Sequence, residues 1–177
     1  MIIDAHAHLW NTQAGRVNGK PVIPLTGGKS DFGGELRQMM PPYMLDGRNT
    51  VEMLMANMDY ARVSGCVITQ EYIDGSQDSY LLECKEKYPD RMRITCLYEE
   101  KPVADEWMSR FDGVKICGGR LENQDLLAHE EVFAQAERLG KFIAIDMADG
   151  DAQTDAMEEL IVRHPDLRIA VGHFGMV

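Results

Sequence analysis

Short apolar runs alternate with segments of helical periodicity along most of the chain. The apolar runs predict six strands, at residues 1–8, 66–70, 92–98, 113–117, 142–146 and 167–172. A first helix is predicted to begin at a capping box formed by Asn49 and Glu52 and to end at Gly65. Helical spacing predicts four more helices, at residues 78–88, 103–111, 126–139 and 154–163.

The predicted strands are short and largely apolar rather than alternating, which is typical of parallel strands buried on both faces. Strict alternation of strand and helix predicts a parallel α/β fold. Periodicity alone leaves open whether the sheet is doubly wound or closed into a barrel. No GxGxxG follows the first strand, which argues against a dinucleotide-binding sheet. Without repeats or linkers, residues 1–177 are expected to form a single domain.

Residues 9–48 interrupt this alternation. They hold seven glycines and four prolines and show no sustained period. An insertion of this length without predicted structure usually forms a functional loop or lid. We therefore expect a long active-site loop directly after the first strand.

Composition narrows the class of protein. With 177 residues, 45% hydrophobic and 27% charged, the chain can bury one sizeable core. A net charge of −11 disfavours nucleic acid and anionic membranes as partners. No long apolar run or signal peptide is found, so a cytoplasmic location is expected. The four cysteines form no CxxC pair and are expected to be buried, reduced thiols.

His6 and His8 are the most informative residues. Side chains two apart on a strand point to the same face, so both imidazoles should leave the end of the first strand together. Neutral imidazole suits zinc and similar ions, and function gathers at the carboxyl ends of strands in parallel α/β folds. The pair therefore predicts a metal site, and the alternative is two histidines by chance on an exposed strand end. Asp4 is a candidate to orient a histidine, or to make only a structural hydrogen bond.

Three more residues belong to the same predicted strand-end cavity. Lys115 lies inside the fourth strand, where a buried ammonium needs a partner, unless the strand is shorter and the side chain is solvated. Asp146 ends the fifth strand and could ligate a metal, accept a proton, or cap the next helix. His173 ends the sixth strand and could bind a substrate carbonyl or act as acid or base. His129 and His164 are interpreted as structural.

Four segments together resemble the amidohydrolase-related family of the amidohydrolase superfamily. They are DAHAHLW at residues 4–10, YPDR at 88–91, GVK at 113–115 and HPDL through GHFG at 164–175. This family includes sugar lactonases, muconolactone-type lactonases and nonoxidative decarboxylases. The resemblance implies a distorted (β/α)8 TIM barrel, here as about six βα units, without strands seven and eight. It also implies that the acidic residue after the eighth strand is absent, so a partial version of a longer protein is expected.

The resemblance also implies an activity. Metal-dependent members often have histidine where Asp146 stands, and a basic residue at the position of Lys115 is common on the lactonase side. We therefore expect hydrolysis of a small lactone or related carboxylate-bearing cyclic ester. His6 and His8 would hold one divalent cation, with zinc favoured, or bind the substrate carbonyl directly if no metal is present. Lys115 and His173 would stabilise the oxyanion, and Asp146 would assist the base.

Two alternatives stay open. One is a nonoxidative decarboxylase acting on an aromatic or unsaturated carboxylic acid. The other is an inactive partial barrel that only binds a ligand or a partner. In each case the expected partner is a small molecule, and a homo-oligomer is compatible with the sequence.

Overall fold

Six parallel strands carry the architecture, in the order β1-β6-β7-β8-β9-β10. The computed structural model describes residues 1–176 and divides into two units, Met1–Ile94 and the residues from Thr95 onward. The boundary falls inside β7 (Met92–Leu97), whose first half pairs with β6 and whose second half pairs with β8. The parallel pairing confirms the predicted α/β class. The prediction of a single domain stays a prediction.

The first unit contains two of the predicted helices. Its strands are β1 (Ile3–Ala7), β6 (Gly65–Ile68) and the start of β7, and its helices are α1 (Val51–Ala61) and α2 (Asp78–Lys87). The predicted capping box is wrong, because Thr50 precedes α1 and makes no side-chain capping bond. The predicted helix end is wrong as well. Arg62 ends α1 in a left-handed conformation with φ 57°, and Gly65 is the first residue of β6.

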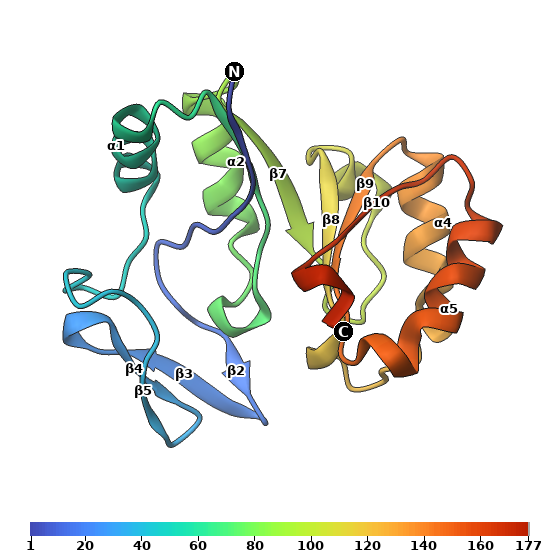
Figure 1. The fold of residues 1–177 in the computed structure, drawn as a ribbon, viewed down its shortest axis with the longest axis horizontal. Coiled ribbons are helices and arrows are strands. Elements are labelled where there is room, and N and C mark those ends of the chain that lie inside the picture. The colour runs from blue at the N-terminus through green and yellow to red at the C-terminus, as the bar shows by residue number, and fades with distance from the viewer. Residues whose placement is uncertain (177) are drawn as a thin grey trace. The chain divides into compact units, whose positions relative to one another are not determined.

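Residues 9–48 are not structureless, which corrects the sequence prediction. They form a four-stranded antiparallel sheet in the order β2-β3-β4-β5, which Figure 1 shows in blue at the end of the first unit opposite the N-terminus. The strands are β2 (Arg16–Val17), β3 (Lys20–Pro24), β4 (Lys29–Phe32) and β5 (Leu36–Gln38). Each strand is too short to show a recognisable alternation of apolar and polar residues in the sequence.

The small sheet builds its core around a residue from outside it. Val22 and Phe32 pack with Ile73, which belongs to the 3-10 turn η2 (Tyr72–Asp74) after β6. Gly15 lies so close to this turn that a Cβ there would be 2.2 Å from the carbonyl carbon of Ile73. The insertion is therefore docked tightly onto the segment that follows β6.

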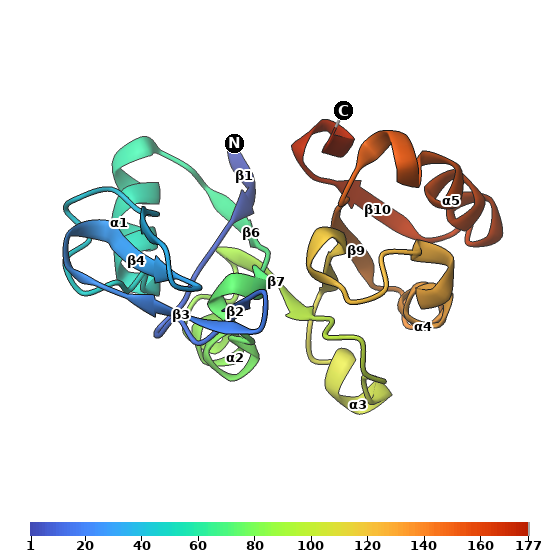
Figure 2. The same cartoon turned by 90° about the horizontal axis from the view of Figure 1, so that it is seen from below.

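The second unit continues the strand–helix alternation. It contains the end of β7 and the strands β8 (Gly113–Cys117), β9 (Phe142–Asp146) and β10 (Arg168–Val171). Its helices are α3 (Asp105–Met108), α4 (Glu130–Arg138), preceded by the turn η4 (Leu126–His129), and α5 (Gly150–Arg163). Figures 1 and 2 show α4 and α5 on the same side of these strands. All five residues of β8 are buried, which makes it a central strand of the core.

The helix α5 begins at Gly150 rather than at Thr154, because the Asp149 carboxylate accepts a hydrogen bond from the amide of Ala152. All four cysteines are buried thiols, as predicted. No helix within residues 1–176 has the length and apolar character needed to cross a membrane. The succession of six parallel strands with five intervening α-helices is that of a partial (β/α)8 barrel.

Candidate active site

The two histidines of the first strand converge, as their spacing predicted. His6 lies in β1 and His8 directly follows Ala7, the last residue of that strand. Their Nε2 atoms are 3.2 Å apart, and their ring centroids are separated by 4.8 Å. Both side chains are half-buried. The pair is therefore one local site rather than two unrelated residues.

The orientation of His8 is set by its neighbours. Its Nδ1 lies 3.0 Å from the carbonyl oxygen of Thr69, which follows β6. A carbonyl can only accept, so in the neutral ring Nδ1 carries the proton and Nε2 carries the lone pair. The Asn49 amide donates to the backbone carbonyl of His8 at 2.8 Å. Asp4 instead accepts from the backbone amide of His6 at 3.1 Å, so this contact does not orient an imidazole ring.

This geometry fits a metal ion. With zinc–nitrogen distances of about 2.0–2.1 Å, two Nε2 atoms separated by 3.2 Å subtend about 100° at the ion, close to the tetrahedral angle. The bond between His8 Nδ1 and a backbone carbonyl is the usual arrangement behind a metal-bound histidine. His6 and His8 can thus supply two ligands.

The three predicted residues of the second unit also lie together. Lys115 is completely buried in β8, and its Nζ is 2.5 Å from Asp146 Oδ2 at the end of β9. His173 Nε2 lies 3.7 Å from the same oxygen. Lys115 is therefore paired inside the strand, and the alternative of a solvated lysine is wrong. The helix-capping alternative for Asp146 is also wrong, because Asp149 caps α5.

The second carboxylate oxygen of Asp146 is unusual. Oδ1 is buried and accepts no hydrogen bond from any group within residues 1–176. A Cβ at Gly172 would lie only 2.1 Å from it, so glycine at that position leaves room for the carboxylate. Buried acceptors are nearly always satisfied. This oxygen is suited to accept a hydrogen bond from a ligand or a water molecule.

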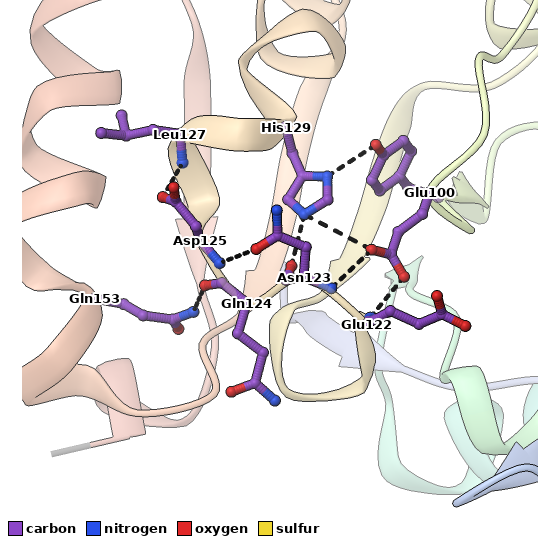
Figure 3. Close-up of polar contacts among 9 residues, drawn as sticks. Glu100, Glu122, Asn123, Gln124, Asp125, Leu127, His129 and Gln153 are labelled. Atoms are coloured by element: carbon purple, nitrogen blue, oxygen red, sulfur yellow. Dashed lines mark hydrogen bonds and ion pairs between the residues drawn. The ribbon is translucent and has the colours of Figure 1, made fainter.

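A polar network fixes the loop that follows β8, as Figure 3 shows. The Glu100 carboxylate accepts hydrogen bonds from the backbone amides of Glu122 at 2.7 Å and Asn123 at 3.1 Å. His129 Nε2 lies 2.7 Å from the Asn123 carbonyl, and its Nδ1 lies 3.1 Å from the Tyr98 hydroxyl. Burial raises the pKa of Tyr98. His129 is thus structural, as predicted, and it acts together with Glu100.

His164, at the end of α5, is structural as well, because its Nδ1 lies 3.0 Å from the carboxylate of Glu137 in α4. Sequence reasoning missed Asn49, Thr69 and Glu100. Asn49 is part of the predicted capping box, and Glu100 is one of many acidic residues in this chain. The one signal in the sequence that could have found them is their position, at or near the end of a strand or of the insertion.

The chain matches known proteins by family and by fold. A family model described as Amidohydrolase matches residues 3–177. A probable 2-pyrone-4,6-dicarboxylic acid hydrolase from Acinetobacter baumannii, with citric acid bound, matches with a TM-score of 0.72 and 18% identity over 98% of this chain. A protein from Pseudomonas putida with the same assignment matches with a TM-score of 0.67 and 18% identity, also over 98% of the chain. The chain spans 58% and 57% of these two proteins.

A more distant fold match is 2,6-dihydroxybenzoate decarboxylase in complex with 2,6-dihydroxybenzoate. The TM-score is 0.51 with 14% identity, over 73% of this chain and 57% of that one. A comparison with curated protein sequences finds no significant match. The family model covers nearly the whole sequence, including both histidines of β1 and the segment around His173. The chain therefore belongs to the amidohydrolase family.

Proposed function

We propose that this protein is a metal-dependent hydrolase that opens a small lactone or a related carboxylate-bearing cyclic ester. The observation that carries the proposal is the convergence of the two Nε2 atoms at 3.2 Å, with the His8 ring held through Nδ1. His6 and His8 would hold one divalent cation, with zinc as the first choice. The fold matches named as pyrone-dicarboxylate hydrolases support this substrate class, because a 2-pyrone is a cyclic ester.

Each residue would have a distinct role in ester hydrolysis. A bound divalent ion polarises a carbonyl and acidifies water. Lys115 and His173 would stabilise the negative charge that develops on the carbonyl oxygen. Asp146 has one oxygen on Lys115 and the other buried without a hydrogen-bond partner among residues 1–176, and it would help to move the proton.

A nonoxidative decarboxylase is the second candidate. The fold match to 2,6-dihydroxybenzoate decarboxylase favours it, because the same framework can present the same side chains to a carboxylic acid. The two reactions break different bonds. Carbon dioxide release and ester hydrolysis, measured on matched aromatic acids and lactones, distinguish them directly.

Replacing the histidine pair tests the proposed site. His6→Ala and His8→Ala should each lower the affinity for the divalent ion by more than about 100-fold, since losing only an outer partner of a ligand costs about 10–100-fold. Turnover should fall with metal content, measured by elemental analysis and by lactone hydrolysis. His164→Gln is the control, because His164 contacts Glu137 and lies at a helix end. Unchanged metal content and turnover in both alanine variants would refute the proposal.

A further inference from the structure

The insertion after β1 is closed at its base by two residues. The Trp10 amide donates to the Asn49 carbonyl and the Asn49 amide donates to the Trp10 carbonyl, both at 3.1 Å. Trp10 is only 2% exposed, and its indole nitrogen donates to the Gly47 carbonyl at 2.7 Å. The two ends of the insertion, at Trp10 and Asn49, are thus held side by side.

The side chain of Asn49 also contacts one of the two proposed metal ligands. Its side-chain amide donates to the His8 backbone carbonyl at 2.8 Å. From the other direction, the Thr69 amide donates to the Ala7 carbonyl at 2.9 Å, and the Thr69 carbonyl meets His8 Nδ1. His8 lies beyond the last residue of β1, where strand pairing no longer fixes the backbone. Its backbone and its ring are therefore held by separate groups.

We propose that Asn49 is a positioning residue for the metal ligand His8, and that the base of the insertion is thereby part of the metal site. The inference rests on the proposed function, because it assigns Asn49 a role in holding the cation. Metal ligands must keep their distances to within about 0.2 Å. A backbone carbonyl released from Asn49 would let the His8 imidazole turn away from His6.

The substitution Asn49→Asp tests this role, because aspartate and asparagine side chains have almost the same shape. A carboxylate cannot donate to the His8 carbonyl, so the hydrogen bond is lost and two oxygens face each other. The probe is Co²⁺, followed by its visible absorption during titration of the metal-free protein. We expect the dissociation constant for Co²⁺ to rise by about 10–100-fold, the usual cost of losing an outer partner of a ligand.

Asn11→Asp is the matched control for charge. Asn11 is also next to the base of the insertion, and its side-chain oxygen accepts from Arg48, which an aspartate would still do. An added negative charge should by itself favour a cation, so this variant should bind Co²⁺ at least as tightly as the wild-type protein. Asn49→Ala removes the donor without adding charge and should weaken binding like Asn49→Asp. Thermal unfolding of the metal-free proteins verifies that each variant is folded.

The outcomes separate the inference from the proposed function. If the wild-type protein binds Co²⁺ and Asn49→Ala binds it equally well, the positioning role is overturned while the metal site stands. If Asn49→Asp fails to fold, the alanine variant decides alone. If the wild-type protein does not bind Co²⁺, the proposed metal site fails and the role of Asn49 fails with it.

Discussion

At the scale of single residues, Lys115 and Asp146 form a buried ion pair in the second unit. A fully buried ammonium is tolerated because a carboxylate lies 2.5 Å away. That carboxylate also has the buried Oδ1 without a hydrogen-bond donor within residues 1–176. The protein thus keeps a charged pair where an apolar pair would pack more simply, which is common at functional sites.

Variants of this pair should show how far each charge offsets the free-energy cost of burying the other. Asp146→Ala leaves the Lys115 charge buried and should destabilise the protein by about 3–5 kcal/mol. The double variant Lys115→Met with Asp146→Leu should recover most of that loss. Urea denaturation of the single variants and the double variant measures the coupling. Purely additive effects would mean that the two side chains do not compensate each other.

At the scale of elements, the turn η2 joins the small sheet to the segment after β6. Asp74 in this turn is only 4% exposed and accepts from the Gln13 side chain at 2.7 Å. Gln13 in turn lies 3.4 Å from the Ser30 hydroxyl of β4. Burial raises the pKa of Asp74 from 3.8 to about 6, and the charge of Glu71 adds to the rise while the Gln13 hydrogen bond opposes it.

This raised pKa predicts a pH dependence of stability. Between about pH 4 and pH 6 the folded protein binds more protons at Asp74 than the unfolded chain, so the free energy of unfolding falls as pH rises through this window. The loss should total about 3 kcal/mol by pH 7. Asp74→Asn should remove this component, which is measured as the difference between wild-type and variant unfolding curves from pH 4 to pH 8.

The control for this experiment is Asp46→Asn, which replaces an exposed aspartate of the same insertion. It should leave the difference curve flat. A wild-type protein that loses no stability relative to Asp74→Asn between pH 4 and pH 7 would contradict a protonated, buried carboxyl in this turn.

At the scale of the whole molecule, charge is divided unevenly. Residues 1–94 carry ten basic and twelve acidic residues, a net charge of −2, whereas residues 95–177 carry eight basic and seventeen acidic residues, a net charge of −9. Some acidic side chains are compensated by ion pairs, such as Asp105 with Arg138 and Glu130 with Arg163. The remaining excess makes self-repulsion a property mainly of the second unit.

Screening should therefore stabilise the second unit more than the first. Raising sodium chloride from about 0.02 M to about 0.3 M shortens the Debye length from roughly 20 Å to below 10 Å. Amide hydrogen exchange should slow more in β8, β9 and α5 than in β6 and α2. An equal response of both units would contradict the greater self-repulsion of the second unit. A loss of protection in the second unit would show that its ion pairs outweigh its self-repulsion.

Strand bounds and site residues were predictable to different degrees. The bounds of β8 and β9 agree with the sequence prediction, because each strand is a short, largely apolar run, as is typical of central parallel strands. The pairing of His6 with His8 followed from the two-residue period of a strand. The capping box at Asn49 was a local pattern that long-range pairing with Trp10 overrode. The catalytic roles of Lys115, Asp146 and His173 stay predictions.

By itself the sequence determined the α/β class, the central strands and the common direction of two imidazoles, because these follow from periods of two and 3.6 residues along a continuous segment. Only the tertiary structure decided that the insertion is a sheet around Ile73, that Asn49 binds the His8 carbonyl, and that Asp146 faces Lys115. Those contacts join residues about 30 or more positions apart. No local pattern encodes them, since they depend on which distant donors and apolar side chains the folded chain brings together.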